Sequence, residues 1–175
     1  LGLGHIGPLA AKPVMEGKSL LFKMFADVDA FDICLNAPEP EDVIHAVKML
    51  APTFGGINLE DIRAPECFAI EGVLVNDLDI PVMHDDQHGT AIVIGAGLLN
   101  AMEITGRSVK TTTVVIMGAG AAGIAAAKFL LALGFPADHI TLVDSQGPVW
   151  RGRGPLSQQK LAFARDGDVG DLTAV

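Results

Sequence analysis

Val114-Val115-Ile116-Met117-Gly118-Ala119-Gly120-Ala121-Ala122-Gly123 joins a β-branched apolar run to a glycine-rich turn with the spacing G-x-G-x-x-G. The alanine-rich stretch 124–133 after the turn predicts a helix that Gly134 ends. A second apolar run, 139–143, then leads to Asp144. An apolar strand, a glycine-rich turn, a helix and a second strand ending in an acid form the βαβ unit that binds dinucleotides. The stretch therefore predicts an α/β fold with a doubly wound Rossmann sheet.

Each part of this unit has an expected role. Gly118 permits the tight turn, Gly120 lets a pyrophosphate approach the backbone, and Gly123 lets the helix pack closely on the strand. Free N–H groups at the start of the helix favour phosphate, so the whole turn, Gly118-Ala119-Gly120-Ala121-Ala122-Gly123, is the candidate cofactor-binding loop. Asp144 would accept hydrogen bonds from the adenosine ribose. A flavin site, or a Rossmann-like fold without a nucleotide, is the alternative.

Two acidic pairs follow apolar runs in the first half of the chain. Glu60-Asp61 follows the run 55–59, and Asp85-Asp86 follows the strand-like run 80–83. Open α/β sheets place their ligands at the carboxyl ends of strands, and carboxylate oxygens are the ligands that Mg²⁺ or Mn²⁺ prefers. A metal site is therefore one interpretation of the pairs, and solvated turns are the other.

His84 and His88 have the i, i+4 spacing of a zinc-binding helix. That motif needs Glu directly after the first histidine, where this chain has Asp85, so we reject zinc. The sequence instead predicts a strand, a polar tip, and then a helix over 90–104 that connects the two halves of the chain.

Proline and helical periodicity organise the start of the chain. Pro13 is expected to break one helix and start another, which runs to Phe25 and carries Lys18 on its apolar side. A lysine there either extends its ammonium to solvent or is buried with a lowered pKa for proton transfer. Further along, alternation predicts a strand over 31–36 and periodicity predicts helices over 41–50 and 64–78.

The composition excludes several classes of protein. A net charge of −9 over 175 residues argues against binding to nucleic acid or to an acidic membrane surface. Only two cysteines, Cys34 and Cys67, are present, which favours a reducing compartment, and we expect a cytoplasmic protein. Because the chain starts at Leu1 rather than Met and ends in a helix-like start at Val175, we expect a central fragment of a longer protein.

With both halves described, the chain resembles the malic enzymes, in particular the compact bacterial type. The resemblance extends over nearly the whole chain and is most specific at 1–18, 55–62 and 84–91, followed by the turn 118–123. It implies oxidative decarboxylation of L-malate to pyruvate and CO₂ with NAD or NADP and with Mg²⁺ or Mn²⁺. It also implies that residues 1–88 are the C-terminal part of the substrate and metal domain and that residues 89–175 are a truncated NAD(P)-binding domain. The resemblance further implies a homodimer or a higher homo-oligomer.

Carried over by position, the resemblance implies metal ligands at Glu60, Asp61 and Asp86. Lys18 then resembles the catalytic lysine and Asp85 the carboxylate that pairs with it. The glycine-spaced loop 2–7, a weak match to a nucleotide loop, belongs to the substrate domain in this family, although His5 stands where Asn or Asp is expected.

The family's proton-donating tyrosine has no counterpart, because the chain contains no tyrosine. In the family this tyrosine lies upstream of Leu1, so we expect the chain by itself to be catalytically incomplete. Two other functions stay open: an amino-acid-dehydrogenase-like oxidoreductase, which needs no acidic pairs, and a non-catalytic module that binds nucleotide or metal.

The choice between NAD and NADP is also open. A carboxylate at Asp144 repels a 2′-phosphate, and related bacterial sequences often carry at position 146 a lysine that would offset the repulsion. This chain has Gln146 instead, which favours NAD.

Overall fold

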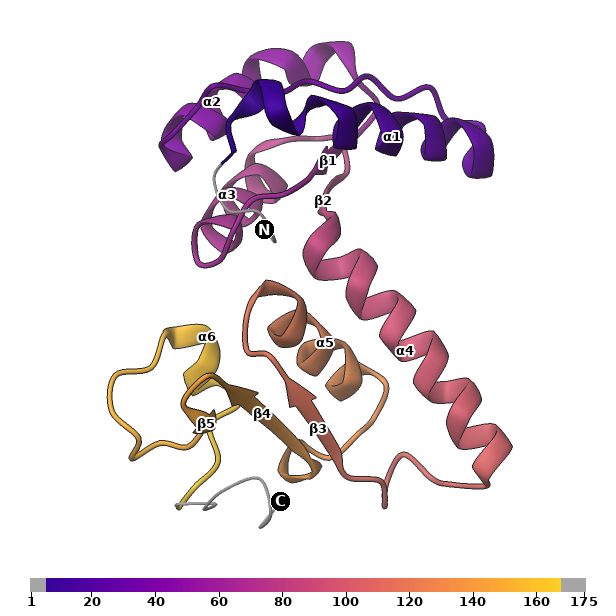
Figure 1. The fold of residues 1–175 in the computed structure, drawn as a ribbon, viewed down its shortest axis with the longest axis vertical. Coiled ribbons are helices and arrows are strands. Elements are labelled where there is room, and N and C mark those ends of the chain that lie inside the picture. Colours follow the sequence, from indigo (N-terminus) through magenta and orange to yellow (C-terminus); the bar gives the residue numbers. More distant parts are fainter. Residues whose placement is uncertain (1–5, 168–175) are drawn as a thin grey trace.

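The computed structural model describes residues 6–167 and places two small sheets in separate parts of the molecule, joined by one long helix (Figure 1). The first part contains α1 (Pro8–Ala26), α2 (Pro40–Leu50), β1 (Ile57–Leu59), α3 (Glu66–Asp77) and β2 (Val82–His84). The connecting helix is α4 (Asp85–Thr105). The second part contains β3 (Val114–Met117), α5 (Ala121–Ala132), β4 (Ile140–Asp144), β5 (Gly147–Pro148) and α6 (Gln158–Leu161).

The first part is organised around a short parallel pair. Strands β1 and β2 pair in parallel with Leu59 opposite His84, so their carboxyl ends meet. Helices α2 and α3, both predicted from periodicity, pack onto each other, and α3 packs onto β2. Their apolar faces close a small core with the strands, made of Val47, Leu59, Ile70 and Leu74.

The second part is the predicted βαβ unit. Strands β3 and β4 pair in parallel with Met117 opposite Val143, and the N–H of Gly118 donates to the carbonyl of Val143 at 2.8 Å. The glycine turn and the end of β4 are therefore neighbours. Helix α5 covers these strands over a separate core that includes Ile124, Leu130 and Leu142. The predicted α/β fold with a Rossmann-type second part is confirmed.

Helix α4 starts five residues earlier than predicted, at Asp85 rather than at Thr90. The stretch expected to be a polar tip is its first turn. Two effects favour the earlier start: Asp85 and Asp86 place negative charge at the positive end of the helix, and the Glu71 carboxylate accepts the N–H of His84 at 2.9 Å. The prediction that α4 connects the two halves is confirmed, and it packs along α5.

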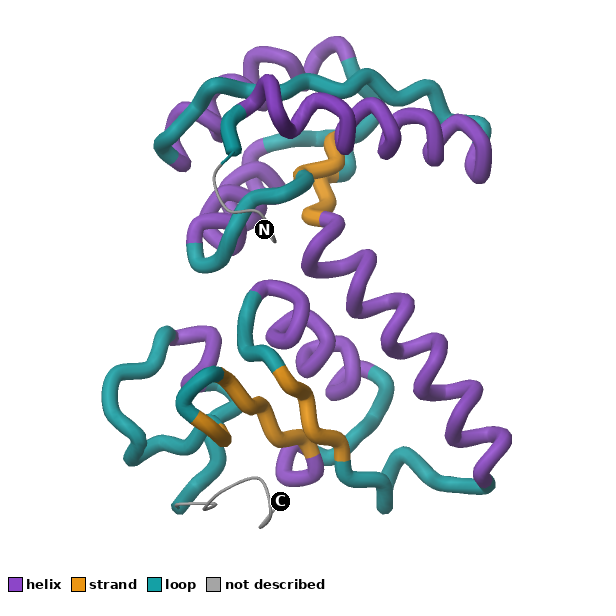
Figure 2. The backbone as a smooth tube through the Cα atoms, in the orientation of Figure 1, coloured by secondary structure: helices purple, strands orange, loops and turns teal. Residues whose placement is uncertain are grey.

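Two predictions for the start of the chain are wrong. Pro13 lies inside α1 and does not break it. A proline removes one backbone hydrogen bond of a helix, and this 19-residue helix keeps the remaining ones. Pro8 is its first residue, a position that proline favours. Residues 31–36 form no strand, because within residues 6–167 no strand pairs with them. They are part of an extended segment beside α1, where Asp32 pairs with Lys12 (Figure 2).

None of the residues of α1 is buried, although many of its side chains are apolar. Leu9 is 91% exposed and Phe25 is 81% exposed. Within the described residues, this helix contributes no side chain to either core.

Several expectations lie wholly or partly outside the described residues. They are the loop 2–7 with His5, of which only Ile6 and Gly7 are described, and the helix-like end beyond Gly167. Within residues 6–167, no helix is both long enough and apolar enough to cross a membrane.

Two glycines of α4 test how closely it packs on α5. A Cβ added at the buried Gly95 would overlap the ring of Phe129, whereas a Cβ at the exposed Gly97 would meet nothing within 4 Å. We expect Gly95→Ala to lower the free energy of unfolding by about 2 kcal/mol, through overpacking. Gly97→Ala should raise it by about 1 kcal/mol, through helix propensity. Chemical denaturation measures both, and equal effects would contradict this packing.

Candidate functional site

The ammonium of Lys18, on α1, contacts the segment after β1 and the first residue of the connecting helix α4. It lies between Asp85, the first residue of α4, and Glu60, the residue after β1. The hydrogen bond to Asp85 Oδ2 is short, and Glu60 Oε2 lies 3.0 Å from Lys18 Nζ. The pairing of Lys18 with Asp85, inferred from resemblance, is present.

The pKa of Lys18 is raised, whereas one of the two interpretations of the sequence was a buried lysine with a lowered pKa. Burial lowers the pKa of the Lys18 ammonium, but hydrogen bonds from it to Asp85 and Glu60 outweigh that effect and raise the pKa above its ordinary value. Two carboxylates on one ammonium make this side chain a cation in the structure.

The two acidic pairs, Glu60-Asp61 and Asp85-Asp86, are joined by a backbone hydrogen bond. Asp61 has a φ of 61°, in the left-handed region that Asp tolerates better than most residues, and its N–H donates to Asp86 Oδ2 at 2.8 Å. Asp85 and Asp86 therefore have different partners, as predicted. The reason is helical rotation rather than the strand alternation first assumed.

Of the three residues predicted as metal ligands, Glu60 contacts Lys18 through its carboxylate, and Asp61 contacts the carboxylate of Asp86 through its backbone N–H. Their oxygens are of the type that Mg²⁺ or Mn²⁺ prefers. In residues 6–167, however, no group of three His, Cys, Asp or Glu side chains has the geometry to hold a metal ion. Glu60 and Asp86 accept hydrogen bonds from Lys18, Asn58 and Asp61 instead. The donors fit such a cation chemically, and binding it requires them to exchange these partners.

The carboxylate of Glu71, on α3, makes hydrogen bonds with three residues at the start of α4. Its Oε1 accepts from the backbone N–H of His84 at 2.9 Å and lies 2.7 Å from His88 Nε2, and its Oε2 accepts from Gln87 Nε2 at 3.1 Å. The fully buried His84 donates through Nε2 to the carbonyl of Ile62 at 3.0 Å. The two imidazole rings thus have different protein partners, Ile62 for His84 and Glu71 for His88.

The glycine turn has the backbone that its sequence requires. Gly118 has a φ of 114°, which L side chains rarely adopt, and a Cβ at Gly123 would overlap the carbonyl oxygen of Gly118. A Cβ at Gly120 would meet nothing within 4 Å, so the backbone there is open to a ligand. Ala121, Ala122 and Gly123 belong to the first turn of α5.

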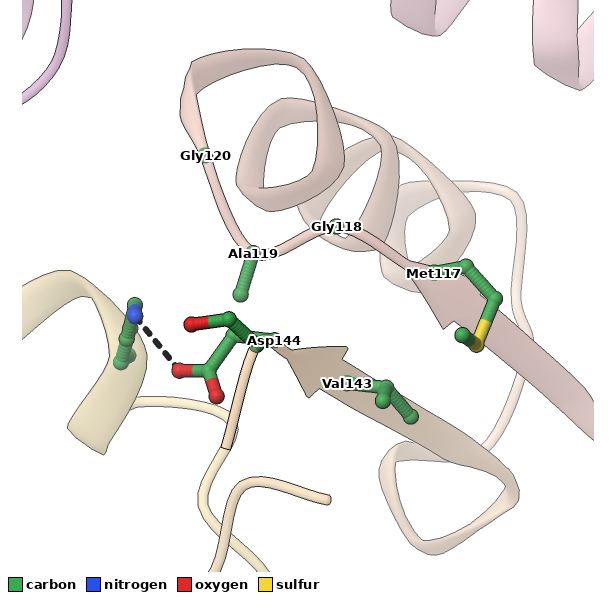
Figure 3. Close-up of a pocket in the computed structure, with 8 residues that line it drawn as sticks. Met117, Gly118, Ala119, Gly120, Val143 and Asp144 are labelled. Atoms are coloured by element: carbon green, nitrogen blue, oxygen red, sulfur yellow. Dashed lines mark hydrogen bonds and ion pairs between the residues drawn. The ribbon is translucent and has the colours of Figure 1, made fainter. Parts of the chain in front are cut away.

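A pocket of about 450 Å³ lies between this turn and the end of β4. Figure 3 shows Asp144 at its edge, facing Ala119 of the turn. The lining consists of residues 117–120, residues 143–145 and Lys160 of α6. The sequence-predicted Gly118, Ala119, Gly120 and Asp144 are therefore brought together, while residues 121–123 are not part of this lining.

Asp144 is held by three hydrogen bonds from the protein. Oδ1 accepts from the N–H of Gln146 at 2.9 Å, and Oδ2 accepts from both Arg153 and Lys160 at 2.7 Å. Burial raises the pKa of Asp144, but the bonds from Arg153 and Lys160 outweigh this effect and hold the pKa well below its usual range. This carboxylate is ionised and already paired.

Comparison with known proteins agrees with both parts of this arrangement. Residues 1–42 match the family model described as malic enzyme, N-terminal domain, and residues 87–172 match malic enzyme, NAD binding domain. The NADP-dependent malic enzyme of Halomonas elongata is 52% identical to the chain over 168 residues. The chain belongs to the malic enzyme family.

Other malic enzymes extend the comparison. The NAD-dependent malic enzyme of Geobacillus stearothermophilus is 59% identical over 151 residues, which are 86% of the chain. The crystal structure of the NAD-dependent malic enzyme of Thermotoga maritima matches 99% of the chain with a TM-score of 0.91 and 48% identity.

The chain spans only part of each of these malic enzymes. The match to the Halomonas enzyme includes 96% of the chain but only 40% of that enzyme. The match to the Geobacillus enzyme includes 31% of that enzyme. It covers 47% of the chain in the Thermotoga structure. These matches favour a malic enzyme over the alternative of an amino-acid dehydrogenase.

Three residues of this malic enzyme segment were missed from the sequence. Glu71 lies beside the buried Ile70 within α3, and an acid on a mostly apolar helix is the signal that would have drawn attention to it. Arg153 lies in the loop after β5 and Lys160 in the short helix α6, and neither segment has apolar periodicity or a known motif. No local pattern indicates that they pair with Asp144.

We expect Asp144→Asn to lower the free energy of unfolding by about 2 kcal/mol at pH 7, because it leaves Arg153 and Lys160 without their shared anion. The pKa of Asp144 is lower in the folded chain than in the unfolded one, so its contribution is complete above the unfolded value of about 3.9. The contribution declines as the pH falls below that value. Urea titrations at several pH values measure the difference between variant and wild type.

The exposed Asp79 gives a control, since Asp79→Asn should change stability little at any pH. A difference between Asp144→Asn and wild type that stayed constant from pH 7 to pH 3, or that grew with acid, would contradict the ion pairing of Asp144.

Proposed function

We propose that this chain carries part of the active site of an enzyme that oxidatively decarboxylates L-malate to pyruvate and CO₂, with NAD or NADP as hydride acceptor. The observation that carries the proposal is the position of Lys18 between Asp85 and Glu60. The names of the relatives support it, since both NAD-dependent and NADP-dependent malic enzymes are among them.

Lys18 and Asp85 are proposed as the catalytic pair. Oxidation removes a hydride from C2 of malate and a proton from its C2 hydroxyl, and Lys18 is the group proposed to take that proton. To do so it must first lose its own proton, and Asp85 holds its side chain in position. The keto acid that results then loses CO₂, and protonation of the remaining enol gives pyruvate.

Glu60, Asp61 and Asp86 are proposed to hold Mg²⁺ or Mn²⁺. A bound divalent cation would supply Lewis-acid stabilisation of negative charge on the C2 oxygen. The support is the chemistry of the oxygen donors and the position of these residues just after β1 and β2, whose carboxyl ends lie side by side.

The turn Gly118–Gly123 and Asp144 are proposed to bind the dinucleotide. The pyrophosphate would lie over Gly120 at the start of α5, and the ribose would lie at Asp144. We further propose that the substrate and metal domain ends at His88 and that the NAD(P)-binding domain begins at Gly89. The match of the NAD binding domain model from residue 87 supports a boundary there. A cytoplasmic location remains a prediction from the cysteine content.

We also propose that the protein assembles as a homodimer or a higher homo-oligomer through α1. This helix buries none of its residues, and the exposed Leu9 and Phe25 give it an apolar surface that a second copy would cover. Light scattering of the chain should give at least twice the mass of one chain, and Phe25→Glu should reduce it to one. A single-chain mass for the unsubstituted protein would contradict the proposal.

The proposed activity is testable in a chimera, because the chain matches a defined part of a longer enzyme. The chain would replace the matching 40% of the Halomonas elongata enzyme. We expect this chimera to reduce NAD or NADP when given malate and Mn²⁺, and to lose activity in EDTA. Lys18→Met should lower kcat by about 10²–10⁴-fold, the usual contribution of a general base. Asp86→Ala should abolish the activity, and added Mn²⁺ should not restore it.

Lys48→Met is the matched control, since Lys48 pairs with Asp77 on an exposed surface away from the cluster. Its chimera should keep the activity of the unsubstituted one. Full activity of the Lys18→Met chimera would refute the catalytic role, and nucleotide binding without any turnover would favour the non-catalytic module.

A further inference from the structure

Helix α4 begins without a capping side chain of its own. Its N-cap residue, His84, makes no side-chain capping hydrogen bond. The first N–H groups of a helix have no partner within the helix, so they need acceptors from elsewhere. In a capping box, a Glu at the third helical position accepts the N–H of the N-cap residue, but α4 has Gln87 at that position. Glu71 of α3 accepts this N–H instead, at 2.9 Å.

The same carboxylate also binds two side chains of the first turn. Gln87 Nε2 donates to Glu71 Oε2 at 3.1 Å, and His88 Nε2 lies 2.7 Å from Glu71 Oε1. Glu71 is itself held in place by its helix, because the adjacent Ile70 is 1% exposed and belongs to the core of the first part. One anchored side chain therefore holds one face of the start of α4.

The other face of this turn carries the two aspartates. Asp85 contacts Lys18, and Asp86 accepts from the backbone N–H of Asp61. Because an α-helix has about 3.6 residues per turn, fixing one face of a turn fixes the direction in which the other face points. The hydrogen bonds of Glu71 therefore set the rotation at which the aspartates face their partners.

The carboxylate of Asp85 has little room to turn. A Cβ added at Gly89, one turn further along α4, would overlap Asp85 Oδ1. The carboxylate thus occupies the space that a side chain at position 89 would need. A rotation of the first turn would move this carboxylate away from the ammonium of Lys18.

We propose that Glu71 is a positioning residue of the reaction: it fixes the rotation of the first turn of α4, so that Asp85 meets Lys18 and Asp86 lies beside the backbone of Asp61. Its own hydrogen bonds go to neighbouring residues of the turn, so its effect passes through α4. This role needs an acceptor oxygen at the reach of a Glu side chain and does not need its charge. The inference rests on the malate-oxidising function proposed above.

Two variants at position 71 separate reach from charge. Glu71→Gln keeps the length and one acceptor oxygen but loses the charge, whereas Glu71→Asp keeps the charge and is one methylene shorter. In the chimera, we expect Glu71→Gln to keep kcat within about threefold and Glu71→Asp to lower it by about 10–100-fold, because small misplacements of catalytic groups are costly. KM for the dinucleotide should change by less than about threefold in both, since the glycine turn lies on other elements. A role for the charge predicts the opposite order.

A second readout does not depend on activity. The N–H of Asp61 donates to Asp86 Oδ2 at 2.8 Å, so its hydrogen exchange reports whether Asp86 is in place. In NMR spectra of the 175-residue chain, Glu71→Asp should speed this exchange by about tenfold, and Glu71→Gln should leave it unchanged. Asp77→Ala is the matched control, because it removes a carboxylate from the other end of α3, where Asp77 pairs with Lys48 on an exposed surface. It should change neither kcat nor this exchange.

The outcomes separate this proposal from the function on which it rests. Full kcat in Glu71→Asp, or unchanged exchange of the Asp61 amide, overturns the positioning role. A Glu71→Gln variant that folds, as thermal unfolding shows, but loses kcat overturns it too. If Glu71→Asp does not fold, Glu71→Gln still decides, because full kcat supports the role and lost kcat overturns it. An inactive unsubstituted chimera overturns the malate-oxidising function, and the amide exchange then still tests the positioning of Asp86.

Discussion

The ammonium of Lys18, held between Asp85 and Glu60, is the interaction on which the first part of the molecule depends. It ties α1, which buries no residue of its own, to the end of β1 and to the start of α4. An ammonium between two partly buried carboxylates is stable only while their charges balance. Lys18 brings one positive charge to the carboxylates of Glu60 and Asp85, which leaves a surplus of negative charge, and this surplus is the electrostatic basis for the divalent-cation site proposed here.

Helix α4 connects this cluster to the second part of the molecule. Its first turn holds Asp85 and Asp86, and further along its length it packs against α5, whose own first turn follows the glycine turn (Figure 1). The contact depends on the absence of a side chain at Gly95. One rigid element therefore links the proposed proton-transfer and metal residues to the nucleotide-binding unit.

The sequence predicted the elements that local patterns encode and failed where distant residues decide. The βαβ unit followed from a β-branched run, three glycines and an acid at fixed spacing, and Gly118 and Gly123 have the geometry expected of them. The pairing of Lys18 with Asp85 came from resemblance. The partners of Asp144 had no local signal, because Arg153 reaches it from a loop and Lys160 from the short helix α6, nine and sixteen residues further along the chain. The strand expected over 31–36 failed because alternation indicates an extended chain and does not supply a pairing strand.

The central claim is that the carboxylates around Lys18 form the metal site of a malic enzyme. Anomalous diffraction at the manganese edge, from crystals of the chain grown with Mn²⁺, tests it most directly. The account predicts one strong peak in contact with the carboxylates of Glu60 and Asp86, with Asp61 turned toward it. A structure in which this cluster keeps its present hydrogen bonds while Mn²⁺ binds elsewhere, or nowhere, would contradict it.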